Sequence, residues 1–131
     1  MENKIIHPEG WKAAKGYSNG ILSNNGQLFI GGQIGWTRDQ IFENKTFIGQ
    51  MEQTLSNIVA IVKAAGGEVK NIVRLTWYIK DKREYLNNQK LIGEVYQKII
   101  GKHYPAMSMV VVRDLIEDEA LLEIEATALI N

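Results

Sequence analysis

Two glutamates in an otherwise apolar segment are the residues of this chain whose type and spacing could do chemistry. Residues 121–126 read Leu-Leu-Glu-Ile-Glu-Ala, which places Glu123 and Glu125 on the same face of an extended strand. Carboxylates are among the side chains that can serve as general acids or bases. The simpler interpretation is a solvated strand face, because acids that alternate with apolar residues usually point into water.

The two histidines, His7 and His103, have no recognisable catalytic or metal-binding partner. Neither lies at a metal-ligand or nucleophile–base spacing from another candidate group, and no Walker, Rossmann or Ser-His-Asp pattern appears. The chain has no cysteine, which excludes disulfides, thiolate metal sites and a cysteine nucleophile. We therefore expect surface or structural histidines, no metal ion and no cofactor.

A second segment of interest, residues 104–112, precedes the glutamates and reads Tyr-Pro-Ala-Met-Ser-Met-Val-Val-Val. Met107 and Met109 alternate within it, so they share one face of a strand. A thioether is a soft, nearly apolar group without a hydrogen-bond donor, so it cannot anchor a carboxylate. From the strand pattern alone, these methionines are expected to be ordinary strand core.

The elements that would carry these residues follow from hydrophobic periodicity and turn signals. Apolar residues at steps of three and four predict a helix over about 46–65, and Asp81 followed by Glu84 fits the capping box of a second helix that runs to about residue 100. Strands are predicted at 21–23, 27–32, 71–79, 107–112 and 121–129. The order β-β-α-β-α-β-β indicates an α+β fold with a mixed sheet and two helices on one face.

One predicted strand lacks a polar face. Both sides of residues 107–112 are almost wholly apolar, and one side is enough to meet the helices. The other side also needs cover, and no further helix is predicted to supply it. Burial against another subunit is the simplest solution, so the pattern predicts an oligomer.

Length and charge point to one soluble domain. The chain of 131 residues is expected to form a single domain over residues 1–131, and 15 Lys+Arg balance 15 Asp+Glu. Without a basic field, binding to nucleic acid is not favoured. Residues 1–10 lack the apolar core of a secretory signal, and no stretch approaches the ~20 apolar residues of a membrane helix. We therefore expect a cytoplasmic protein with no membrane partner.

Several segments, taken in order, resemble the RidA/YjgF (L-PSP endoribonuclease-like) family. Residues 16–20 are similar to its Gly-Pro-Tyr-Ser segment, and residues 28–35 to its Ser-Gly-Gln-Ile strand end. Residues 53–67 resemble its first helix with the glycine stop, and residues 73–81 its third main strand. The most informative likeness is the C-terminal pair of segments described above, the first of which normally reads Pro-Ala-Arg-Ser/Thr in the family.

The resemblance implies a chorismate-mutase-like α+β fold that assembles as a homotrimer, with small-molecule pockets at the subunit interfaces. It also implies hydrolysis of reactive enamines and imines, such as 2-aminoacrylate, to a keto acid and ammonia. In the family an arginine holds the substrate carboxylate in a bidentate pair, and a glutamate with backbone groups positions the attacking water. The resemblance makes Glu123 the catalytic residue, and the substrate-binding residues Tyr17, Gly31, Gly32, Asn88 or Gln89, Met107 and Met109.

Only part of the family's machinery is present in this chain. Glu123 and Tyr17 stand where the family's glutamate and tyrosine stand, whereas Gly31 replaces a serine and Met107 replaces the arginine. Losing a buried charge-assisted pair typically costs roughly 2–5 kcal/mol of binding. We therefore expect deaminase activity on the usual amino-acid-derived substrates to be weak or absent.

Four functional hypotheses remain open at this point. The first is a weakened deaminase, and the second is another hydrolase or a binding protein for a ligand without a carboxylate, which Glu123 could still serve by directing a water. The third is the family's older description as an endoribonuclease or translation inhibitor, against which the balanced charge and the lack of a basic–aromatic stripe argue. The fourth is a structural or chaperone-like oligomer with empty pockets.

Overall fold

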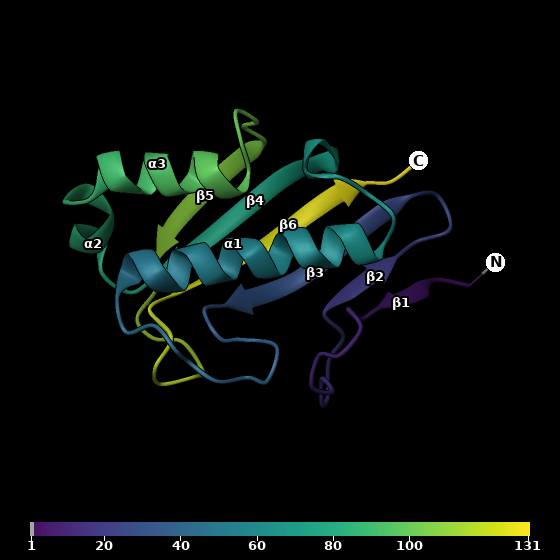
Figure 1. Cartoon of the computed structure of the whole chain (residues 1–131), viewed down its shortest axis with the longest axis horizontal. Helices are drawn as coiled ribbons and strands as arrows, with labels where there is room; N and C mark the ends of the chain where they lie inside the picture. Colours follow the sequence, from purple (N-terminus) through teal and green to yellow (C-terminus); the bar gives the residue numbers. More distant parts are fainter. Residues whose placement is uncertain (1) are drawn as a thin grey trace.

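The chain forms a six-stranded mixed sheet with its helices packed on one face (Figure 1). The computed structural model describes residues 2–131, so Met1, the first residue of the predicted domain, lies outside the described residues. The strands are β1 (Lys4–Ile6), β2 (Gly20–Leu22), β3 (Gln27–Ile34), β4 (Ile72–Ile79), β5 (Ala106–Val111) and β6 (Leu122–Leu129). The helices are α1 (Phe47–Ala64), α2 (Lys82–Leu86) and α3 (Gln89–Ile99), and a short 3-10 helix, η1 (Val69–Asn71), precedes β4. The predicted α+β class is confirmed.

The strand order across the sheet separates the two segments of interest. It runs β1-β2-β3-β6-β4-β5, so β6 lies between β3 and β4 and pairs antiparallel with both. β5 pairs in parallel with β4 and forms one edge of the sheet. A parallel pair needs a long crossover connection, and α2 with α3 supplies it. The glutamate segment is therefore central, while the methionine segment lies at an edge.

Helix α1 covers the middle of the sheet. Thr46 caps its N-terminus, and the side-chain oxygen of this residue accepts a backbone N–H of the first turn at 3.1 Å. Met51 and Leu55 of its apolar stripe are fully buried in the core. Gly66 ends the helix with a φ of 87°, a conformation that glycine adopts without strain. The predicted helix over 46–65 is confirmed.

The first strands extend further than predicted. β1, which the sequence pattern does not predict, pairs antiparallel with β2. Such a short strand shows too little alternation to be recognised. β3 continues to Ile34, past the predicted end at residue 32. A register shift between Ile30 and Gln33 accommodates the intervening glycines before β3 pairs again with β6.

The predicted faces of β4 are wrong at its first two residues. Strict alternation over 71–79 predicts Val73 on the core side and Ile72 on the opposite side. In the structure Ile72 is buried and Val73 is 40% exposed. A register shift between Ile72 and Arg74 interrupts the pairing with β6, and such an irregularity reverses the alternation that precedes it. From Leu75 onward the predicted faces are confirmed.

The second predicted helix is divided into α2 and α3. Between them, Asn88 has φ −131° and ψ 21°, and its side-chain Nδ2 donates to the carbonyl of Glu84 at 2.7 Å. An asparagine that bonds a nearby carbonyl competes with helical backbone bonding, which explains a break that apolar periodicity does not reveal. Asp81 caps α2 as predicted, but its carboxylate accepts the backbone N–H of Arg83 at 2.9 Å, one residue earlier than in a capping box.

Strand β5 is apolar and exposed on both faces. Val110, opposite Tyr78 of β4, is 45% exposed, and Val111, opposite the buried Ile79, is 53% exposed. No helix lies over the face of the sheet to which Val110 belongs (Figure 1). The structure therefore reproduces the doubly apolar strand that the sequence pattern predicts, and its cover by another subunit remains a prediction.

A buried glutamine of α1 holds the loop that leads into β6. Gln50 is 1% exposed, and its Nε2 donates to the carbonyls of Asn44 and Glu119 at 3.1 and 2.9 Å. Its Oε1 accepts the backbone N–H of Leu121 at 2.8 Å. One side chain thus satisfies three backbone groups of two loops and fixes the start of the strand that carries Glu123.

Replacing Gln50 with alanine should lower the free energy of unfolding by about 2–4 kcal/mol, because it leaves buried backbone groups without partners. Urea unfolding at one fixed protein concentration would measure the loss. The matched control is Gln53→Ala on the same helix, where the side-chain Nε2 has one described bond, to Asn57. Equal losses in the two variants would show that Gln50 has no special role.

Candidate functional site

Glu123 projects from the helix-free face of the central strand β6. Its neighbours Leu122 and Ile124 are fully buried on the helix side, so the alternation of the strand turns Glu123 the other way. It lies opposite Ile34 of β3 and Tyr78 of β4. Among the described residues no hydrogen-bond partner occupies its carboxylate, which is thus available to a water molecule or a ligand.

The glycines of β3 make room for this carboxylate. A Cβ added at Gly32 would collide with Oε2 of Glu123. The neighbouring Gly31 donates its backbone N–H to the carbonyl of Asn19 at 2.9 Å, and its own carbonyl accepts Nε2 of Gln33 at 3.1 Å. The register shift in β3 is therefore held by specific bonds, and any side chain at Gly32 would displace the carboxylate of Glu123 from this position.

The environment of Glu123 favours its protonated form. Burial raises the pKa of Glu123 above its usual value, and the nearby charge of Glu125 raises it further. Glu125 differs because its Oε1 accepts the hydroxyl of Tyr78 at 2.6 Å. A carboxyl with a raised pKa exchanges protons closer to neutral pH, which suits a group that moves a proton to or from water.

The raised pKa of Glu123 predicts that the stability difference between the wild type and a Glu123→Gln variant depends on pH. Because the pKa of Glu123 is higher in the folded than in the unfolded protein, its stabilising contribution is full below the ordinary glutamate value of 4.5 and is lost as pH rises through the folded pKa. Glu123→Gln should therefore gain stability over the wild type as pH rises from about 4 to 7. Denaturant midpoints across that range would measure it, with Glu84→Gln on α2 correcting for the loss of one charge. A stability difference between Glu123→Gln and the wild type that does not change with pH would contradict the raised pKa of Glu123.

Tyr17 lies in the loop before β2, and the carbonyl of the next residue, Ser18, lies beside Gly31 of β3. It is 49% exposed and lines a hollow with Ile5, His7 and Asn19, among others. Partial burial raises the pKa of Tyr17, and the charge of Glu117 raises it further. The phenol therefore stays protonated at neutral pH and can donate a hydrogen bond. Its hollow shares no residue with the region around Met107.

Met107 and Met109 lie on the opposite face of the sheet from Glu123. They pair with Leu75 and Trp77 of β4, whose side chains belong to the core beneath the helices. With α3 they form an apolar groove of about 210 Å³ at the β5 edge. The residues that line this groove are Trp77, Tyr85, Gln89, Ile92, Gly93, Tyr96, Gln97, Tyr104, Met107 and Met109. None of them carries a charge at neutral pH.

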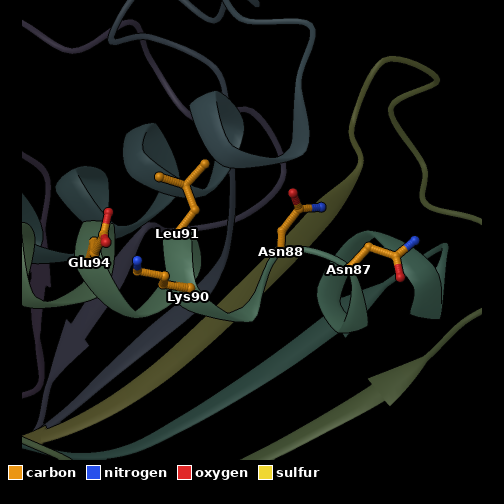
Figure 2. A pocket seen from close by; sticks show the side chains of 5 residues that line it. All are labelled: Asn87, Asn88, Lys90, Leu91 and Glu94. Atoms are coloured by element: carbon orange, nitrogen blue, oxygen red, sulfur yellow. The ribbon is translucent and has the colours of Figure 1, made fainter.

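Asn88 and Gln89, the two candidate amides of the second predicted helix, line different hollows in the structure. Gln89 lines the groove with the methionines. Asn88 lines a different hollow, on the outer side of the α2–α3 junction, together with Asn87, Lys90, Leu91 and Glu94. Figure 2 shows that these five side chains project in different directions rather than toward one point. Within one chain, Gln89 rather than Asn88 therefore lines the same groove as Met107.

A third hollow lies on the helix-free face and was not indicated by the sequence pattern. Gly31 borders it together with Arg74, Thr76 and Glu125, and its volume is about 390 Å³. These positions come from β3, β4 and β6, three strands that are far apart in sequence. The residues Trp77, Tyr85, Tyr96 and Tyr104 of the groove were also missed, because only the packing of α3 over β5 brings them to Met107.

The predicted site residues thus form two groups on opposite faces of one chain. Glu123 and Gly32 meet on the helix-free face, whereas Met107, Met109 and Gln89 meet under α3. A chain by itself does not bring the glutamate to the groove. Any site that uses both groups requires the helix-free face of one copy to meet the β5 edge of another.

The histidines have structural partners. Nε2 of His103 donates to the carbonyl of Ile72 at 2.7 Å, and Nε2 of His7 donates to the carbonyl of Trp11 at 3.0 Å. Within residues 2–131 no group of three or more His, Asp and Glu side chains is placed to hold a metal ion. In the same range no helix is long and apolar enough to cross a membrane.

A family model described as Endoribonuclease L-PSP matches residues 8–130 of this chain. The chain belongs to the RidA/YjgF family. Among curated relatives, the 2-iminobutanoate/2-iminopropanoate deaminase of Escherichia coli is 39% identical over 130 residues, covering 96% of this chain and 97% of the relative. The RidA/YjgF resemblance that the motifs indicate is therefore confirmed over almost the whole chain.

Solved RidA/YjgF structures agree with this fold. E. coli TdcF, solved with bound serine, is 34% identical and superposes with a TM-score of 0.81, covering 98% of this chain and 99% of that chain. A Rid-family protein of unknown function from Yersinia pestis is 30% identical with a TM-score of 0.84, covering 98% of this chain and 100% of that chain. The fold of this chain is therefore that of the RidA/YjgF family, which includes a curated imine deaminase.

Proposed function

We propose that this protein is a homotrimeric RidA/YjgF hydrolase whose intersubunit pockets take small imine or enamine substrates that lack a carboxylate. The observation that carries the proposal is the uncharged groove around Met107, at the position where the family resemblance implies an arginine. The reaction type comes from the E. coli relative, whose name describes a deaminase of two imino acids. The preference for substrates without a carboxylate comes from this chain's own residues.

The division of the site residues supports assembly from several copies. β5 exposes apolar residues at an edge, and the helix-free face exposes others, including Phe29 at 49%. If the β5 edge of one copy packs on the helix-free face of the next, the groove around Met107 meets the carboxylate of Glu123. One arrangement then covers both apolar surfaces and completes the site.

Val110→Glu should disrupt this assembly, because it places a charge on the exposed apolar face of β5. Light scattering at micromolar concentration should give about three times 14.8 kDa for the wild type and a smaller mass for the variant. The matched control is Leu91→Glu on α3, since Leu91 and Val110 are each 45% exposed. A monomeric wild type would remove the basis for an intersubunit site.

Glu123 supplies the hydrolytic chemistry in this proposal. Its carboxylate has no described hydrogen-bond partner, and burial, with the nearby charge of Glu125, raises its pKa and so moves its proton exchange with water toward neutral pH. Oriented by this group, the water attacks the imine carbon, the carbon–nitrogen bond breaks, and ammonia leaves as a carbonyl compound forms. Tyr17 and the backbone beside Gly31 are the polar groups proposed to orient the substrate.

The proposal is tested by comparing two imines of the same size, one with a carboxylate and one with a neutral ester or amide in its place. The wild type should hydrolyse the carboxylate-bearing imine weakly or not at all, because thioethers cannot bind the anion. The neutral imine should be the better substrate by kcat/KM. Robust hydrolysis of 2-aminoacrylate, comparable with that of an arginine-bearing relative, would overturn the proposal.

Binding without catalysis is the second candidate, favoured by the mainly apolar groove. In that case a ligand should raise the unfolding temperature while neither imine is turned over. Binding to RNA receives no support from the residues described, because the groove is uncharged and the chain has equal numbers of basic and acidic residues.

A further inference from the structure

One residue that lines the groove carries a buried hydrogen-bond donor without an acceptor. Trp77 is 2% exposed, and among the described side chains its Nε1 is the buried polar atom that has no hydrogen-bond partner. The same indole lines the groove beside Met107 and Met109. Buried tryptophan N–H groups usually find an acceptor, so an unpaired one in the wall of a cavity indicates a missing partner.

The surroundings limit the chemistry of that partner. Tyr85, Ile92, Tyr96 and the two methionines present rings and apolar groups rather than charges. Burial, with a smaller effect from Tyr104, raises the pKa of Tyr96 to about 12, so this phenol stays neutral. Its hydroxyl already donates to the carbonyl of His103 at 2.7 Å. An anionic ligand would therefore lose its hydration without gaining a cation.

The size of the groove limits the partner further. Its volume of about 210 Å³ lies below the roughly 300–1,000 Å³ of sites for drug-sized ligands. A molecule with a single ring would fit between the tyrosine rings and the methionine side chains, and both groups contact aromatic ligands well.

We propose that the groove binds a neutral, largely apolar molecule of single-ring size whose carbonyl oxygen accepts the hydrogen bond of Trp77 Nε1. This inference rests on the proposed function only in taking the groove as the ligand side of the site. It makes Trp77 a binding residue that selects ligands with an acceptor, and it names the ligand class as neutral ketones, esters or amides and their imine counterparts. Met107 and Met109 contribute apolar contact.

The indole N–H resonances test the proposal directly. The chain has three tryptophans, and the peak of Trp77 is identified as the one that remains in both Trp11→Phe and Trp36→Phe proteins, so no change at Trp77 itself is needed. The probes are acetophenone, ethylbenzene and benzoate, which share one ring and differ in acceptor and charge. Acetophenone should move the Trp77 N–H proton downfield, the direction of a new hydrogen bond, while ethylbenzene should not and benzoate should bind weakly.

Trp77→Phe provides the second measurement, since it keeps an aromatic ring and removes the donor. Its affinity for acetophenone should fall about fivefold, as expected for one neutral hydrogen bond, while its affinity for ethylbenzene stays within about twofold. Equal responses of the Trp77 peak to acetophenone and ethylbenzene would overturn the proposal. So would a Trp77 peak that stays unmoved at millimolar acetophenone, the result expected if a side chain of a second copy fills the groove.

The two proposals fail separately. Hydrolysis of carboxylate-bearing imines by the wild type would overturn the proposed function whatever the indole peak does. An unmoved indole peak in a protein that ignores carboxylate-bearing imines and hydrolyses neutral ones would overturn only the role of Trp77.

Discussion

Replacing Met107 with arginine should raise kcat/KM for 2-aminoacrylate by about two to four powers of ten. The expected range corresponds to the roughly 2–5 kcal/mol associated with a buried, charge-assisted pair. Met107 is 44% exposed on the edge strand, so a longer side chain has room to extend without entering the core. A guanidinium there would offer the two-pronged donor geometry that carboxylates accept and thioethers cannot supply.

The assay for this prediction generates the imine in place with a dehydratase or an amino-acid oxidase. Met107→Leu is the matched control, because it changes the side chain while leaving the position uncharged, and it should remain as slow as the wild type. A fast wild type would mean that another residue anchors the carboxylate. A variant that stays slow although it remains folded and keeps the molecular mass of the wild type in solution would mean that the rest of the site no longer supports deamination.

Removing the carboxyl of Glu123 should abolish most of the 2-aminoacrylate hydrolysis that the Met107→Arg substitution introduces. In the Met107→Arg background, Glu123→Gln should lower kcat by about 10²–10⁴, the range for loss of a positioned acid–base group. Glutamine keeps the size of the side chain that Gly32 accommodates, so the change removes proton transfer while largely preserving the packing. The effect should appear in kcat more than in KM, because the carboxyl acts on water rather than on the substrate carboxylate.

Glu125→Gln in the same background is the matched control for charge. Glu125 projects from the same face of β6, but its Oε1 is engaged by the hydroxyl of Tyr78. An amide oxygen can still accept that hydroxyl, so activity should fall by less than about tenfold. Equal losses for the two substitutions would point to the electrostatics of the whole face rather than to a water positioned by Glu123.

The sequence by itself determined the local elements of the fold. The periodicity of α1 and its glycine stop are properties of neighbouring residues, so they could be recognised without a structure. The doubly apolar strand is equally visible in the chain, and so is Met107 at the position where the family resemblance implies an arginine. The family's order of motifs placed Glu123 and Tyr17 as candidates, and membership of that family is confirmed.

Other features of the sheet and helices depend on contacts between distant segments. The position of β6 between β3 and β4 places Glu123 on the face away from Met107, and no local pattern states the strand order. The irregularity after Ile72 reverses an alternation that periodicity alone extends unbroken. The break at Asn88 follows from a side-chain bond, and this break leaves Gln89 rather than Asn88 facing the groove.

The unpaired indole of Trp77 is the clearest case of a feature that only the tertiary structure decided. In sequence it is one apolar residue of a core strand, and the predicted face is correct. Whether its N–H meets an acceptor depends on Tyr85, Tyr96 and the neighbouring strand β5, which the crossover through α2 and α3 brings beside it. Local patterns report which side of a strand is buried, whereas hydrogen-bond satisfaction depends on every segment that packs against it.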